Sequence, residues 1–414
     1  PNSHEFGECT SNCGQFRVYW AVSCAFAGVG RAVDCGRALS RGAFLPRRLT
    51  WSVLHQSRAA AGGACSLCAI MAVMRKSHDP STIRASLRSR ASLIAYGWTD
   101  KQIRAEVRAK GVRRLHHGWY MPHTLWDELF WEQQHLAHVM AVVDDAREQS
   151  PVVVRESAAV THGLPLYRCL PAKVHVICVG DARASNSADV FRHVGPLDAR
   201  EIVEIGGIRC TSLARTVVDV ARSCDLETAV ACADAALRSV AVHQDDPWTY
   251  DGDAAERLRR EMHVVLGKMP RARGARRARW VIDFADGRAQ LPGESVSRLR
   301  LVQLGFVVPR IQVPVERPGG RRYYVDIDAG SWLAEFDGAG KYLDPQLRAG
   351  ASAADVVVSE KRREDWIRAV TGKMTVRLAD EHIATAEDCA ARLAEYGIQP
   401  PRHRPVPDPG PPPR

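Results

Sequence analysis

Between residues 81 and 122 the apolar positions follow two helical periods and then an alternating one. STIRASLRSRASLIAYG predicts a helix that stops at Gly97. TDKQIRAEVRAKG predicts a second helix, with Thr99 and Gln102 in capping-box spacing and Gly111 at its end. VRRLHHGWYMP then alternates around a glycine and stops at a proline, which predicts a basic hairpin. Two helices followed by a basic hairpin are the layout of a winged helix-turn-helix.

Residues 123–270 mix both periods, so a mixed α/β middle domain is predicted. PAKVHVICVG and EIVEIGGIRC each predict a strand, and SLARTVVDVARSCDLETAVACADAALRSV predicts two helices joined near Asp225. The basic stretch RARGARRAR follows, and we expect residues 271–289 to be a linker to the last domain.

Residues 290–398 predict a helix, three strands, a second helix and a final strand. The helices are expected over residues 292–305 and 359–371, and the final strand lies in MTVRL. The chain is therefore predicted to be an α+β multidomain protein: a winged helix-turn-helix over 81–122, the mixed middle domain, and a C-terminal αβββαβ domain.

The two ends of the sequence differ from the rest. Residues 1–73 show no sustained period, and we expect a poorly ordered or non-native leader there. This leader holds six of the twelve cysteines, but CTSNC and CSLC lie too far apart for an ordinary zinc module. The other cysteines have apolar neighbours and are predicted to be buried free thiols. Residues 399–414 are dominated by proline and are predicted to be disordered.

Composition adds a charge argument. The 414 residues are 46% apolar and 25% charged, as in a soluble globular protein, and the net charge is +10. A basic chain favours an anionic partner, of which nucleic acid is the commonest, although a basic but inert surface is the alternative. No apolar run reaches the roughly 18–20 residues that cross a bilayer. We therefore expect a cytoplasmic protein without a membrane partner.

Against this basic background, the stretch YYVDIDAGSWLAEFDG concentrates acidic residues in one predicted hairpin. If Gly330 and Ser331 form a two-residue loop, Asp326 faces Glu335 on the neighbouring strand. Asp328 and Asp337 flank this pair, and the apolar residues Val325, Ile327, Ala334 and Phe336 share the other face.

Two interpretations of the opposed acids stay open. Opposed carboxylates destabilise a bare hairpin, whereas Mg²⁺ between them would reverse the sign of the interaction and activate water. Glu294, in the first turn of the preceding helix, is placed to reach the same ion, and Lys341 or Lys361 to stabilise charge in a transition state. The alternative is a solvated sheet edge whose charges prevent aggregation.

PGES, RLRL, VDID, EFDGAGKY and EKRREDWIR, in this order over about 105 residues, resemble the PD-(D/E)XK nuclease superfamily. The closer resemblance is to its very-short-patch-repair-like branch, an actinobacterial domain of unknown function. The resemblance implies a restriction-endonuclease-like fold, DNA phosphodiester hydrolysis with Mg²⁺ or Mn²⁺, Asp326 and Glu335 as metal ligands, and Glu294 as an accessory acid. Asp337 departs from the family's lysine and leaves Lys341 as its stand-in.

LIAYGWTDKQIRAEVRAKGVRRLHHGWYMP, VTHGLPL and CTSLARTVVDVAR are similar to AbiEi-type antitoxins over residues 80–240. These antitoxins repress their own operons, and their partner toxin is a nucleotidyltransferase encoded next door. Within the winged helix itself, the second helix would enter the major groove of duplex DNA and the hairpin would contact phosphates or the minor groove. The predicted contacts are Lys101, Gln102, Arg104 and Arg108 from the helix and Arg113, Arg114, His116 and His117 from the hairpin. A merely solvated basic helix and hairpin is the alternative.

The sequence thus favours a DNA-binding protein with a magnesium-dependent endonuclease domain. The alternative is an AbiEi-type regulator whose nuclease-like domain is degenerate and binds DNA without cutting it. A structural or partner-binding protein with no nucleic-acid role is a third and weaker hypothesis. The sequence does not define the oligomeric state.

Overall fold

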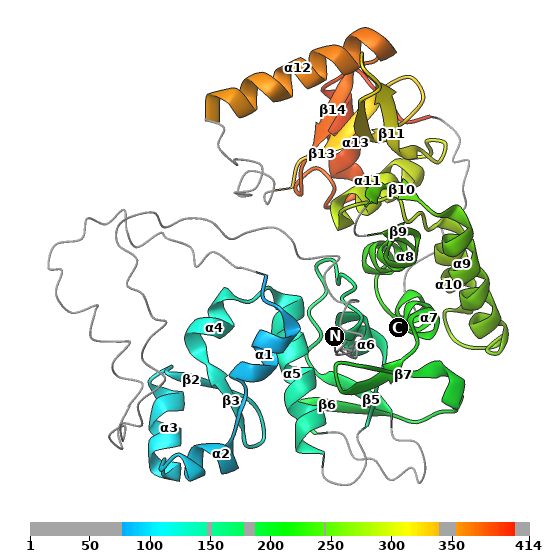
Figure 1. The fold of residues 1–414 in the computed structure, drawn as a ribbon. Helices are drawn as coiled ribbons and strands as arrows, with labels where there is room; N and C mark the ends of the chain where they lie inside the picture. Colours follow the sequence, from blue (N-terminus) through cyan, green and yellow to red (C-terminus); the bar gives the residue numbers. More distant parts are fainter. Residues whose placement is uncertain (1–76, 147–150, 178–186, 244–245, 339–352, 402–414) are drawn as a thin grey trace, which may run out of the picture.

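Helices and strands are mixed along the chain, and the described residues form four sheets, so the predicted mixed α and β architecture is confirmed (Figure 1). The computed structural model describes residues 77–146, 151–177, 187–243, 246–338 and 353–401. The predicted leader, most of the predicted tail and Lys341 lie outside the described residues. Among the residues that are described, no helix is both long and apolar enough to cross a bilayer.

The N-terminal part differs from the prediction at its first helix. Its elements are α1 Pro80–Ser86, β1 Arg88–Ser89, α2 Arg90–Ala95, α3 Asp100–Arg108, β2 Val112–His116 and β3 Trp119–Pro122. The sequence predicts one helix as far as Gly97, but the chain is extended at Leu87 and pairs Arg88 and Ser89 with β3. The Ser89 side chain then accepts the Ser92 amide and begins a new helix, which explains the break.

The second predicted helix is confirmed as α3, and so is its capping box. The Thr99 hydroxyl accepts the Gln102 amide, and the Gln102 side chain accepts the Thr99 amide. The helix ends differently from the prediction, because the left-handed residue after it is Lys110 and not Gly111. A Cβ at Gly111 would lie 1.9 Å from a terminal oxygen of the flexible Glu106 side chain, which would have to move aside.

A five-stranded sheet and its helices form the middle of the chain. In chain order the elements are α4 His123–Glu128, α5 Trp131–Asp145, β4 Val152–Val153, α6 Arg155–Thr161, β5 Val174–Ile177, β6 Val190–His193, η4 Ala199–Glu201, β7 Ile202–Ile205, β8 Ile208–Thr211, α7 Leu213–Ser223 and α8 Leu226–Ala241. The two helices predicted around Asp225 are confirmed, with Asp225 as the N-cap of α8. EIVEIGGIRC is a hairpin and not one strand, since Gly206 and Gly207 both take left-handed backbone and turn the chain.

The region predicted as a basic linker, residues 271–289, is largely helical. After β9 Val242–His243, β10 Asp246–Tyr250 and α9 Gly252–Gly267, it forms α10 Ala275–Phe284. The linker prediction is wrong because the arginines hide an apolar period: Ala278, Val281 and Ile282 are buried at helical spacing. Arg277 is buried with them and donates to the Ala221 carbonyl oxygen.

The C-terminal part has the predicted order of elements with one helix added. It contains α11 Pro292–Gln303, β11 Arg310–Glu316, β12 Arg322–Asp328, β13 Leu333–Phe336, α12 Ala353–Thr371, β14 Thr375–Leu378 and α13 Ala386–Ala394. The sheet order is β11-β12-β13-β14, antiparallel except for the parallel pair β13 and β14. The sequence prediction did not include α13, and it began α12 six residues too late.

Separate apolar clusters cover the two faces of this sheet. Ile327, Ala334 and Phe336 pack with residues of α11 and α13, as alternation predicts. Val325, predicted on the same face, instead packs with Leu333 and with Ile367 of α12. Val325 departs from the predicted alternation where the sheet is interrupted. Between the pairs Ile311–Ile327 and Val313–Val325, β11 and β12 form no pair.

A buried ion pair joins the middle of the chain to the C-terminal sheet. Arg298 of α11 donates to both carboxylate oxygens of Asp234 in α8, each at 3.0 Å, and both side chains are almost fully buried. Arg298 also donates to the Phe284 carbonyl oxygen of α10. Removing one partner of such a pair generally costs about 3–5 kcal/mol, because the other charge stays buried. The pair therefore fixes α11, which carries Glu294, against the rest of the chain.

Candidate functional site

The acidic hairpin has the register that the sequence predicts. Ile327 pairs with Ala334 and Asp328 with Leu333, and the Ala329 amide donates to the Trp332 carbonyl oxygen. Gly330 takes the left-handed backbone that the two-residue turn requires. The paired register ends there; continued by one residue, it would set Asp326 opposite Glu335.

At that rung the two strands separate, and the Asp326 carboxylate takes the place of a backbone partner. One of its oxygens accepts the Phe336 amide at 3.0 Å. In a regular ladder this amide would bond to the main chain of β12. The Asp326 side chain is buried and held in place by the main chain of β13.

Gln312 of β11 bridges Asp326 to Glu294 of α11. Its Nε2 atom donates to Glu294 Oε2 at 2.9 Å and to Asp326 Oδ1 at 3.2 Å. The backbone amide of Gln290 also donates to Glu294 Oε2. The structure therefore brings Glu294 and Asp326 together, as the sequence predicts, through a glutamine that sequence reasoning did not identify.

Glu335 and Asp337 are bound by arginines. Arg363 of α12 lies 2.7 Å from one Glu335 oxygen, and Arg377 of β14 lies 3.7 Å from the other. Arg377 also pairs with Asp337 at 2.8 Å. Burial acts to lower the pKa of Arg363, but the hydrogen bond and charge of Glu335 outweigh it and raise that pKa. The pKa of Arg377 is likewise raised, with burial opposing the effect of Asp337.

These contacts of Asp326 differ from those of Glu335, the acid that the sequence predicts opposite it. Asp326 bonds to the Phe336 amide and to Gln312, which also binds Glu294 of α11, whereas Glu335 pairs with Arg363 of α12. Both acids are compensated: Arg363 and Arg377 reach Glu335, and Asp326 accepts amide hydrogens while its charge helps to raise the pKa of Arg363. The sequence signals for Arg363 and Arg377 were the arginines in EKRRED and MTVRL.

Asp328 closes the acidic hairpin at the turn. Lys373 donates to it at 2.8 Å, Arg310 pairs with its other oxygen, and the Gly330 amide donates at 2.9 Å. Burial alone would raise the pKa of Asp328, but these donors outweigh it and hold the pKa below its ordinary value. Lys373, which sequence reasoning missed, thus reaches the acidic cluster, whereas Lys361 is exposed on α12.

The donor set determines which cation the cluster suits. Among the described residues, no group of three or more His, Cys, Asp or Glu side chains is arranged to hold a metal ion. Mg²⁺ usually takes one or two carboxylates and completes its shell with water and substrate phosphate. The Glu294 and Asp326 carboxylates, which share one amide donor, meet this smaller requirement.

The predicted DNA-contacting residues of α3 are exposed. Lys101, Arg104 and Arg108 lie three and four residues apart, so their side chains share one face of the helix. Gln102 is exposed as well, but its side-chain oxygen is occupied in the capping box. The helix therefore presents three cations, and Gln102 is left with its NH₂ group for an outside partner.

The hairpin residues are less uniform. His116 is held between Asp145 of α5 and Asp189, which fastens the hairpin to the middle of the chain. Arg113 stacks on the Trp126 ring with its guanidinium 4.3 Å from the ring centroid. His117 is exposed at the turn, and Arg114 is exposed on β2. Of the four predicted hairpin contacts, His116 is thus committed to protein partners.

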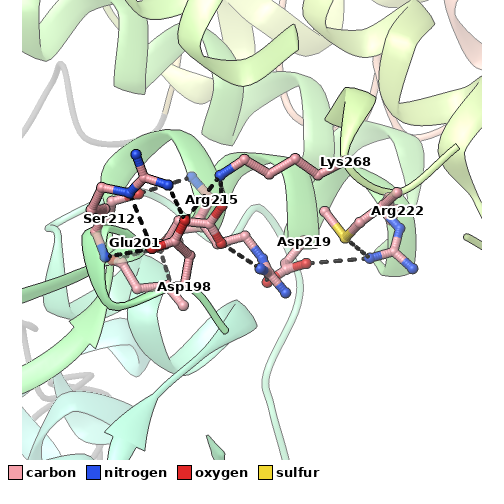
Figure 2. A network of polar contacts seen from close by, with 11 residues as sticks. Asp198, Glu201, Ser212, Arg215, Asp219, Arg222 and Lys268 are labelled. Carbon is pink, nitrogen blue, oxygen red and sulfur yellow. Dashed lines mark hydrogen bonds and ion pairs between the residues drawn. The ribbon is translucent and has the colours of Figure 1, made fainter. Parts of the chain in front are cut away.

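A second polar network, in the middle of the chain, was not predicted. Figure 2 shows its members around Glu201: Asp198, Ser212, Arg215, Asp219, Arg222 and Lys268. Arg215 lies 2.6 Å from Glu201 and 2.9 Å from Asp219, and Lys268 lies 2.8 Å from Glu201. The spacing of Arg215 and Asp219 on α7 was the available signal. Because each carboxylate has a cationic partner, the network ties α7 and α9 to the sheet.

The other chemistry-bearing residues of the middle domain are core residues. His162 Nε2 contacts the Thr211 carbonyl oxygen at 2.7 Å, and burial lowers its pKa, which agrees with the predicted loop or core role. Of the free cysteines outside the leader, Cys210, Cys224, Cys232 and Cys389 are buried, whereas Cys169 is only half-buried. This confirms the expectation of buried thiols at the buried positions.

Comparison with known proteins identifies relatives, and their descriptions name no activity. No protein-family model matches the chain. Two relatives described as uncharacterised proteins, from Mycobacterium tuberculosis strains CDC 1551 / Oshkosh and ATCC 25618 / H37Rv, are each 25% identical over 299 residues. The match covers 68% of this chain and 96% of each relative. The chain is therefore similar to these proteins along most of their length.

The lowered pKa of Asp328 predicts a pH-dependent contribution to stability. A carboxyl whose folded pKa is depressed stabilises the fold above its unfolded pKa of about 3.9, and this contribution is lost as the pH falls through the folded value. Asp328→Asn should lower the free energy of unfolding at pH 7, and its difference from the wild type should shrink below about pH 4. Urea unfolding at several pH values measures this difference in the free energy of unfolding.

The exposed control Glu204→Gln should change stability by less than about 0.5 kcal/mol. A deficit for Asp328→Asn that is the same at all pH values would contradict the assignment.

Proposed function

We propose that the chain is a DNA-binding protein whose C-terminal domain is a metal-dependent endonuclease of the PD-(D/E)XK type. The observation that carries the proposal is the convergence of Glu294 and Asp326 on Gln312 where β12 and β13 separate. An αβββαβ order of elements, with acids on the first helix and on the second and third strands, fits a restriction-endonuclease-like domain.

Glu294 and Asp326 are the residues that would hold the cation, Mg²⁺ or Mn²⁺. When bound, the ion would activate water and neutralise charge that develops on a phosphodiester. Glu335 and Asp337 lie beside this pair and orient Arg363 and Arg377, whose guanidinium groups suit a DNA phosphate. We assign metal binding to Glu294 and Asp326, and a phosphate-facing role to the arginines that Glu335 and Asp337 hold.

Residues 80–122 supply the proposed binding to duplex DNA as a winged helix-turn-helix. The three exposed cations of α3 share a face, as in a helix that enters the major groove. The contacts of His116 fix the hairpin to α5, so that α3 and the hairpin are presented by one rigid unit. The net charge of +10 supports association with a polyanion.

The second candidate function is an AbiEi-type transcriptional regulator, with a nucleotidyltransferase-type toxin as its partner. The observation that favours it is the pairing of Glu335 and Asp337 with arginines. In this account the acids of the C-terminal domain serve in ion pairs, and the domain binds DNA without cutting it. The two candidates differ in whether cleavage occurs and share the binding by α3.

Plasmid cleavage separates the two candidates. We expect the wild type to nick supercoiled plasmid with Mg²⁺ and to lose this activity in EDTA. Asp326→Ala should reduce the rate by roughly 100-fold or more, the usual effect of losing one preorganised electrostatic group. The matched control Glu316→Gln, an exposed acid at the end of β11, should leave the rate unchanged. Equal nicking by the wild type and Asp326→Ala would overturn the endonuclease proposal, and absence of nicking by both would favour the regulator.

Binding by α3 is tested separately from cleavage. Arg104→Ala with Arg108→Ala should weaken duplex binding, and the dependence of log affinity on log salt should become shallower by about 0.9 for each lost phosphate contact. Fluorescence anisotropy with labelled duplex over a salt series measures both quantities. Arg200→Ala with Arg257→Ala, two exposed arginines in the middle of the chain, is the charge-matched control. Unchanged affinity and slope in the α3 variant would show that DNA binds elsewhere.

A further inference from the structure

Gln312 has a backbone conformation that its position in a strand does not favour. Its φ is +51°, in the left-handed region, although it is not glycine and lies inside β11. The Cβ of an L-residue is crowded there, so the conformation persists only where the surroundings hold it. The rung that it would form with Asp326 is the one omitted from the pairing of β11 and β12.

The side chain of Gln312 accounts for this strain. An amide group carries two N–H donors on one nitrogen. Here that nitrogen lies 2.9 Å from the Glu294 carboxylate and 3.2 Å from the Asp326 carboxylate. The amide oxygen accepts from the Gln290 side chain, which fixes the orientation of the group. The left-handed backbone thus places a neutral double donor between two buried acids.

We propose that Gln312 is a positioning residue of the carboxylate centre. It holds the Glu294 and Asp326 side chains together before a divalent cation binds, and it keeps them oriented toward that cation afterwards. The cation part of this inference rests on the proposed endonuclease function, whereas the clamp between the two acids is independent of it. Hydrogen-bonding partners of metal ligands act in this way, and their loss typically weakens metal affinity 10–100-fold.

Substitution of Gln312 by glycine best separates the effect of backbone strain from the effect of the side-chain amide. Gln312→Gly removes the amide and at the same time relieves the backbone strain, since glycine adopts positive φ readily. Strain relief alone would make this variant more stable than the wild type. Loss of the clamp would make it less stable, because the two carboxylates would lose their shared donor. Lys110→Gly, at another positive-φ residue remote from the acids, reports strain relief alone.

The test measures thermal unfolding of the full chain in EDTA and in a Mg²⁺ titration, without DNA. In EDTA, Gln312→Gly should unfold at a lower temperature than the wild type, whereas Lys110→Gly should not. Combined with Asp326→Asn, Gln312→Gly should cost less than it does alone, because the two residues act on one contact. In the titration, the Mg²⁺ concentration that gives half of the stabilisation should rise about 10–100-fold in Gln312→Gly.

The possible outcomes keep this inference apart from the nuclease proposal. Coupling between Gln312 and Asp326 in EDTA supports the clamp, even if plasmid cleavage is absent and the endonuclease proposal fails. Additive effects of the two substitutions, with Gln312→Gly as stable as the wild type and an unchanged Mg²⁺ midpoint, would overturn it. If Gln312→Gly does not fold, Gln312→Asn carries the same comparison, since asparagine tolerates the left-handed region and its amide is too short to bridge both acids.

Discussion

Carboxylates packed inside a sheet repel one another unless a donor or cation compensates each of them, and this constraint organises the C-terminal part of the chain. Arg363 draws α12 onto the hairpin through Glu335, and it also donates to the Tyr324 carbonyl oxygen. Arg377 joins β14 to the same hairpin. The elements that surround the acids are therefore fixed in part by the acids themselves. Without Arg363 and Arg377, the buried anion of Glu335 would be strongly unfavourable.

The kind of compensation divides the acidic cluster into two halves. Arg363 and Arg377 pair with Glu335 on one side, while the Gln312 amide bridges Asp326 and Glu294 on the other, and the charge of Asp326 also contributes to the raised pKa of Arg363. The Gln312 amide reduces the repulsion between Glu294 and Asp326 without adding a positive charge of its own, which is compatible with a cation beside them. The division gives a physical reason to locate the proposed cation between α11 and β12, and a DNA phosphate near Arg363.

Local signals in the sequence were sufficient for the hairpin register and for the α3 capping box, because both depend on residues close together in the chain. Gly330 and Ser331 alone determine which residues of β12 and β13 face each other. The partners of the acids were not predictable in this way, since Gln312 reaches Asp326 through a backbone conformation that no periodicity signals. The arginine-rich composition of residues 271–289 led to the prediction of a linker. The apolar period of α10, in which Ala278 and its neighbours are buried, is hard to recognise among so many charged residues.

The central claim is that Glu294 and Asp326 form one cation site, oriented by Gln312. Anomalous X-ray diffraction from crystals grown with Mn²⁺ tests it most directly, because Mn²⁺ accepts the same oxygen ligands as Mg²⁺ and its position is observed independently of activity. The account predicts an anomalous peak in coordinating contact with both carboxylates, and its loss in Asp326→Asn. A peak located only at Glu335 and Asp337, or a well-ordered Glu294–Gln312–Asp326 cluster without any peak at saturating Mn²⁺, would contradict it.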